Sequence, residues 1–140
     1  MFIFILDDAC QTIRISLENN ALTSQGSLQG KYRLSTPING ENSWASTSKA
    51  IWYHSEKNIW LIGSQQKRGG DIAGVYASRI SGSGPDNGNI LWHYTNDGWK
   101  EDSAKDIKVQ CIDNAGTIFQ EPLYIFNPEA ILDLETPLWK

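Results

Sequence analysis

The two histidines are the side chains in this sequence best suited to proton transfer near neutral pH. General acid–base catalysis needs such a group in a cleft, with a partner that orients it. His54 falls in an expected hairpin turn, which favours a solvent-exposed side chain. His93 stands between Trp92 and Tyr94, a pattern typical of a strand residue. A small hydrolase or lyase that uses His93 with a nearby carboxylate is the enzymatic alternative that these residues leave open.

The motifs that position a nucleophile, a phosphate or a metal ion are not found. Residues 80–84 read Ile-Ser-Gly-Ser-Gly and lack the leading glycine of a G-x-S-x-G nucleophile elbow. Neither a dinucleotide fingerprint nor a P-loop occurs, and spacing indicates no third ligand for a two-histidine zinc site. The Asp86-Asn87-Gly88-Asn89 run fails the EF-hand pattern, which favours a surface turn. The sequence therefore indicates no nameable catalytic residue, no metal and no cofactor.

Aromatic residues form the candidate binding set, because the chain carries six tryptophans in 140 residues. Alternation along strands places about half of such rings in the core, and the rest must be exposed or covered. Trp52 and Tyr53 are adjacent and must face opposite sides of one strand. Exposed aromatic rings often mark recognition surfaces. The candidate ligand-binding residues combine aromatic and Asn/Asp-rich loop positions: Trp44, Trp52, Tyr53, Trp92, Tyr94, Trp99, Asp86, Asn87 and Asn89.

Short apolar and aromatic runs, separated by Gly, Asn, Asp and Ser clusters, indicate an all-β fold. Apolar residues alternate with polar ones through 11–17, and residues 50–53 and 59–62 predict a β-hairpin. Asn96-Asp97-Gly98 is suited to a tight turn. Further strands are expected at 31–34, 72–79, 89–94 and 106–112, with loops at 65–71 and 81–89. We predict an antiparallel β-sandwich or flattened barrel of about seven to nine strands.

The length fits one domain, which we place at residues 1–119, followed by an apolar tail at 120–140. Asn127 would cap a short C-terminal helix that begins at Pro128. Both this tail and Met1–Leu6 are more apolar than chain ends commonly are. The tail is therefore expected to pack on the domain or on a partner, and the two ends offer a route to homo- or hetero-oligomers.

Charge and hydropathy exclude two classes of partner. The net charge is −4, and the only basic groupings are Lys67–Arg68 and the spaced Lys105 and Lys108, which argues against nucleic-acid binding. No apolar run approaches the roughly 18 residues of a membrane-spanning helix. The opening residues lack the basic start and cleavage site of a complete signal peptide.

The two cysteines, Cys10 and Cys111, bracket the strand-rich region and form no C-x-x-C pair. They are compatible with two buried thiols or with a disulfide that closes a long loop. The disulfide is favoured, and with it an oxidising compartment and a secreted or extracellular location.

The order of short aromatic motifs resembles Trp/Tyr-rich β modules that recur in large extracellular proteins of invertebrates. The likeness covers residues 10–111 and consists of Gly30-x-Tyr32, Ile51-Trp52-Tyr53, Trp60-x-Ile62-Gly63, Tyr76-Ala77-Ser78, Trp92-x-Tyr94, Trp99 and Val109-x-Cys111. It implies an extracellular, non-enzymatic module and transfers no functional residue. We therefore expect a non-catalytic, lectin-like binding or assembly module for a protein or glycan, with a structural subunit of a larger assembly as a further alternative.

Overall fold

The computed structural model describes residues 9–114. The chain divides into a unit of residues 11–112 and a unit formed by residues 1–10 and 113–140. The first unit holds nearly all of the described chain. The expected C-terminal helix, the apolar tail and the apolar start all lie outside the described residues, so the boundary at residue 119 stays a prediction.

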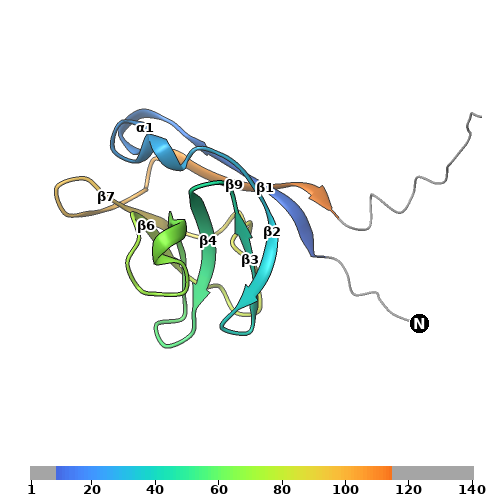
Figure 1. The fold of residues 1–140 in the computed structure, drawn as a ribbon. Helices are drawn as coiled ribbons and strands as arrows, with labels where there is room; N and C mark the ends of the chain where they lie inside the picture. Colours follow the sequence, from blue (N-terminus) through green and yellow to red (C-terminus); the bar gives the residue numbers. More distant parts are fainter. Residues whose placement is uncertain (1–8, 115–140) are drawn as a thin grey trace, which may run out of the picture. The chain divides into compact units, whose positions relative to one another are not determined.

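Within residues 9–114, nine strands form one continuous antiparallel sheet that curls into a half-barrel (Figure 1). The strands are β1 (Cys10–Leu17), β2 (Gly30–Ile38), β3 (Glu41–Ala45), β4 (Lys49–His54), β5 (Ile59–Ser64), β6 (Val75–Ser78), β7 (Trp92–Thr95), β8 (Trp99–Glu101) and β9 (Ile107–Asn114). One short helix, α1 (Asn19–Gln25), and the 3-10 turns η1 (Gly26–Leu28) and η2 (Gln65–Lys67) join them. The all-β prediction is confirmed. Two architectures were expected, a sandwich and a flattened barrel, and a single curled sheet corresponds to the barrel.

The strand order is β8-β7-β6-β5-β4-β3-β2-β1-β9. Strands β1 to β8 therefore follow one another as a meander, and β9 joins the far edge beside β1. The predicted hairpin of β4 and β5 is confirmed, with Trp52 opposite Leu61. The predicted turn between β7 and β8 is also confirmed. Its residues Asp97 and Gly98 both have positive φ, which Asp tolerates and Gly adopts without strain.

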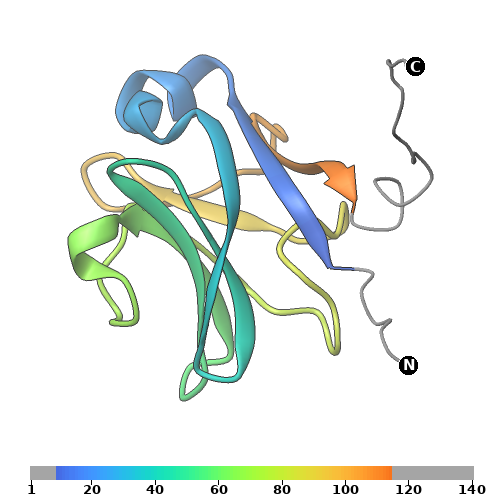
Figure 2. The same cartoon turned by 45° about the vertical axis from the view of Figure 1, so that its right-hand side comes forward.

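The inner face of the half-barrel carries the main core. Directly paired residues share a face, so the register places on this side a set of buried side chains: Ile13, Ile15, Leu17, Tyr32, Trp44, Ile51, Trp60, Ile62, Val75, Ala77, Trp92 and Tyr94. The predicted alternation in β1 is therefore confirmed. The short helix α1 covers one end of this core, where Ala21 is fully buried (Figure 2).

The outer face is also buried where the connection between β5 and β6, residues 65–74, folds back over it. Trp52 is fully buried there, and its indole Nε1 donates a hydrogen bond to the Gly70 carbonyl oxygen at 2.9 Å. Gly63 allows the connection to approach, because a Cβ at this position would lie 2.9 Å from the Cβ of Ala73. The sheet therefore packs apolar residues on both faces in this region.

Helix α1 and strand β3 are among the elements that were not predicted from the sequence. Helix α1 carries no side-chain cap and has only one buried residue, so apolar periodicity could not reveal it. Strand β3 has the largely polar sequence Glu-Asn-Ser-Trp-Ala. Its Trp44 lies in the core because it pairs with Ile51 of β4. Strand β6 is shorter than the expected 72–79, because residues 72–74 belong to the connection that covers the outer face.

The predicted link between Cys10 and Cys111 is confirmed, since both cysteines are disulfide-bonded. None of the helices within residues 9–114 is long and apolar enough to cross a membrane.

Burial raises the pKa of the Tyr32 hydroxyl above its ordinary value of 10.0. Because the folded-state pKa is the higher one, the stability that the neutral hydroxyl contributes is present below pH 10.0 and is lost as the pH rises towards the folded-state value. We expect the free energy of unfolding to fall above this pH, and to fall less steeply in Tyr32→Phe. Urea unfolding midpoints on both sides of that pH test this. Parallel pH profiles of the two proteins would contradict it.

Candidate functional site

Trp99 is the only exposed residue among the five tryptophans within residues 9–114, with half of its surface accessible. It begins β8, directly after the tight turn, and is paired with Thr95 of β7. The pairing places Trp99 on the outer face of the sheet. Its ring and the Tyr76 ring meet edge to face, with centroids 4.7 Å apart and planes at 85°. A large aromatic surface is thus held in place at an exposed position.

Tyr76 of β6 contacts both Trp99 of β8 and His93 of β7. Its ring stacks on His93, with centroids 4.7 Å apart and planes at 9°. The register explains the contact, because Tyr76 of β6 lies opposite His93 of β7, which in turn lies opposite Glu101 of β8. The buried Nδ1 atom of His93 has no hydrogen-bond partner within the described part of the chain. The contact that the structure gives the His93 ring is therefore its stacking on one face of the Tyr76 ring.

Two charged side chains lie beside the aromatic pair. The Lys57 ammonium is 3.5 Å from a carboxylate oxygen of Asp71, and both side chains are more than half exposed. Lys57 belongs to the turn between β4 and β5, where its backbone N–H donates to His54 Nδ1 at 3.3 Å. Exposed ion pairs of this kind contribute little stability, so both groups remain able to exchange partners.

The connection that carries Asp71 is fixed at two points before it reaches the site. Arg68 donates hydrogen bonds from its Nη2 atom to the Ser35 hydroxyl (2.9 Å), the Thr36 carbonyl oxygen (3.0 Å) and the Ser43 hydroxyl (2.8 Å). The bond from Trp52 to Gly70 holds the next turn. These contacts fix the backbone immediately before Asp71 and present its carboxylate to Lys57.

Together these groups line a cavity of about 350 Å³, which we call the Trp99 site. Its lining residues are Lys57, Ile59, Leu61, Asp71, Ala73, Tyr76 and Trp99. The site combines an apolar floor, a half-exposed indole ring, one cationic donor and one anionic acceptor. It can hold a ligand that offers an apolar surface together with groups that both donate and accept hydrogen bonds.

The structure separates the aromatic residues predicted from the sequence into core and surface positions. Trp44, Trp52, Trp92 and Tyr94 are buried, Tyr53 is partly buried, and Trp99 alone lines the Trp99 site. A ligand-binding role for this set remains a prediction. Sequence reasoning missed Lys57, Asp71 and Tyr76, because turn lysines and loop aspartates are common and only the folded chain brings them together.

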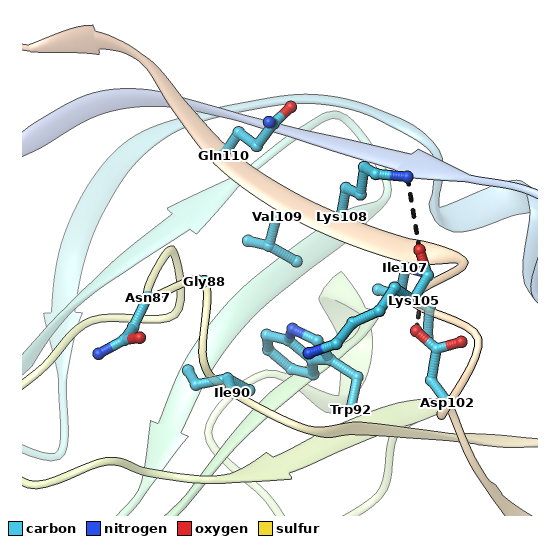
Figure 3. Close-up of a pocket in the computed structure, with 10 residues that line it drawn as sticks. All are labelled: Asn87, Gly88, Ile90, Trp92, Asp102, Lys105, Ile107, Lys108, Val109 and Gln110. Carbon is cyan, nitrogen blue, oxygen red and sulfur yellow. Dashed lines mark hydrogen bonds between the residues drawn. The ribbon is translucent and has the colours of Figure 1, made fainter.

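The predicted loop residues lie near a second cavity, the edge pocket, between β7 and β9 (Figure 3). The edge pocket measures about 230 Å³ and is lined by Asn87, Gly88, Ile90, Trp92, Asp102, Lys105, Ile107, Lys108, Val109 and Gln110. Of the sequence-predicted positions, it includes Asn87 and Trp92. Asp86 and Asn89 are exposed, and Asn87 accepts a hydrogen bond from the Asn89 backbone N–H at 2.8 Å.

A third aromatic group surrounds Arg79, which follows β6. The guanidinium lies 4.8 Å from the Tyr53 ring centroid and 5.6 Å from that of Trp60. Its hydrogen bond to Glu41, at 3.0 Å, raises the pKa of Arg79. Since the cation is already paired and stacked, this group serves packing rather than ligand capture.

Within residues 9–114, no group of three or more His, Cys, Asp or Glu side chains is placed to hold a metal ion. Comparison of the chain with protein-family models, curated proteins and solved structures found no match.

Proposed function

We propose that this chain is a secreted, non-catalytic binding module that recognises a glycan at the Trp99 site. The observation that carries the proposal is the half-exposed Trp99 ring, held against Tyr76 beside the Lys57–Asp71 pair. The disulfide supports an extracellular location, since such bonds persist mainly in oxidising compartments.

The chemistry of a sugar ring fits these groups. A pyranose presents an apolar face of C–H bonds, which packs on the flat face of an indole, and a periphery of hydroxyl groups. Each hydroxyl both donates and accepts hydrogen bonds, as serine and threonine hydroxyls do. Lys57 supplies donors and Asp71 supplies acceptors, and the pair has no net charge. A neutral sugar therefore matches the Trp99 site better than an anion or a cation does.

The rigidity of the Trp99 site supports the same conclusion. The aromatic rings are positioned by strand pairing, and the Asp71 backbone is anchored by Arg68 and Trp52. Little side-chain or loop ordering is therefore left for the ligand to impose, which favours binding.

Trp99→Ala should weaken binding of a cognate oligosaccharide by at least about thirtyfold, because truncating a tryptophan anchor costs roughly 2 kcal/mol or more. The experiment screens the full chain against a panel of defined oligosaccharides and measures the best ligand by calorimetry. Leu22→Ala on α1 removes a comparably exposed apolar side chain away from the Trp99 site and should bind normally. A panel without a hit, or hits that Trp99→Ala retains, would overturn the proposal.

The pairing of His93 with Glu101 keeps one alternative function open. The two residues lie directly opposite each other on neighbouring strands, so a carboxylate stands beside His93, as the hydrolase or lyase alternative requires. On our proposal His93→Gln leaves oligosaccharide affinity within a few-fold. A turnover of the bound oligosaccharide that falls by about three orders of magnitude or more in His93→Gln, with the fold intact, would establish the enzymatic function instead.

A further inference from the structure

We propose that the edge pocket is a second binding site, independent of the Trp99 site, and that it takes a small ligand with an apolar body and one carboxylate. The proposal rests on the apolar floor of the pocket, on the Lys105 side chain across its mouth and on the net positive charge of its lining.

The floor of the edge pocket is apolar and comes from two sides. Ile90 and Trp92 lie on one side and Ile107 and Val109, from β9, on the other, and all four are buried (Figure 3). A volume of about 230 Å³ corresponds to roughly seven or eight groups of the size of a water molecule. The edge pocket therefore suits the body of a short aliphatic or aromatic acid, and hexanoate is a molecule of this size.

The polar groups at the mouth mainly donate hydrogen bonds. The Lys105 side chain extends across the mouth towards Trp92, whereas the Lys108 side chain leaves β9 on the side opposite Val109 and turns to the Lys105 carbonyl oxygen (Figure 3). The two ion pairs that the structure places within residues 9–114 involve Lys57 and Arg79, so neither of these lysines is neutralised by an acid there. Both lysine residues are exposed, and the Lys105 ammonium can turn towards an anion.

Asp102 is the one carboxylate in the lining, and it already accepts hydrogen bonds from the backbone. Its two oxygens accept hydrogen bonds from the N–H groups of Asp106 (2.9 Å) and Ile107 (2.8 Å). Two lysines and one aspartate leave the lining with a net charge of +1. The charge of the edge pocket thus favours an anionic ligand, whereas the Lys57–Asp71 pair favours a neutral one.

The same contacts hold the backbone that carries Lys105 in position. Asp102 ties the segment between β8 and β9 together, and its backbone N–H donates to the Trp92 carbonyl oxygen at 2.8 Å. Lys105 has a left-handed backbone, with φ of 61°, and its carbonyl oxygen accepts a hydrogen bond from the Lys108 ammonium at 3.4 Å. The mouth is therefore formed before a ligand arrives, which reduces the ordering that binding requires.

The test is a two-dimensional NMR titration of the ¹⁵N-labelled full chain with hexanoate and with hexan-1-ol. We expect saturable shifts at the amides of Ile90, Trp92 and Val109, with hexanoate binding more tightly than the alcohol. Lys105→Gln should weaken hexanoate about two- to fivefold, the size expected of one exposed charge contact, and should leave hexan-1-ol unchanged. Added salt should weaken hexanoate selectively.

Lys31→Gln is the matched control, since it removes an exposed lysine of β2 that does not line the edge pocket. Trp99→Ala should also leave hexanoate affinity unchanged, so failure of the glycan proposal and failure of this one are distinguishable. Three results would each overturn the inference: no shifts at the lining residues, equal affinity for acid and alcohol, or equal weakening by Lys31→Gln.

Discussion

Replacing Cys10 with serine should lower the free energy of unfolding by about 4–5 kcal/mol. The disulfide joins positions 10 and 111, and closing a loop of this length removes a large part of the conformational entropy of the unfolded chain. Such a loss is a large share of the stability of an ordinary domain. The variant is therefore expected to be partly unfolded at physiological temperature.

Urea unfolding of the wild-type chain with and without reductant, compared with Cys10→Ser and Cys111→Ser, measures this effect. The two variants should agree with each other and with reduced wild type, and reductant should not change them further. Thiol titration of the unfolded, unreduced wild-type chain should find no free thiol. Equal midpoints for oxidised and reduced protein would show that the disulfide contributes nothing.

Local sequence was sufficient to predict much of the sheet. The alternation in 11–17 and the hairpin of 50–53 with 59–62 were correct, because side-chain period and turn chemistry are set by neighbouring residues. Helix α1 could not be predicted in this way. Its Gln25 donates hydrogen bonds to the Thr95 carbonyl and hydroxyl oxygens, seventy residues further along the chain. Contacts at that distance stabilise a helix that the weak local propensity of its residues does not predict.

The candidate sites were harder to predict, because side chains on the same face of this sheet differ in burial. Trp52 lies on the outer face and would be exposed if residues 65–74 did not cover it. Trp99 lies on the same face near the edge of the sheet and stays exposed. The sequence around these two tryptophans does not show which one is buried and which one is exposed. Only the path of a loop decides which is core and which is surface, and loop paths depend on long-range contacts such as those of Arg68.

Trp52→Ala should lower the free energy of unfolding by about 3–5 kcal/mol, the range for a large aromatic side chain removed from a core. Trp52 is fully buried and packs in the outer-face cluster with Ala50 and Leu61. Its removal also frees the Gly70 carbonyl oxygen and the connection that presents Asp71. The variant should therefore lose oligosaccharide affinity at the Trp99 site as well as stability.

Trp52→Phe separates the hydrogen bond from the packing, and Trp60→Phe is its matched control. Both tryptophans are buried, but Trp60 Nε1 has no hydrogen-bond partner within residues 9–114. Both variants lose a similar volume, so Trp52→Phe should be less stable than Trp60→Phe by about 1–3 kcal/mol, the cost of an unmade bond at a buried acceptor. Trp52→Phe alone should weaken the oligosaccharide, because only it loosens the backbone before Asp71. Urea unfolding and calorimetry on the same samples measure both effects, and equal losses in the two variants would refute the anchoring role of Trp52.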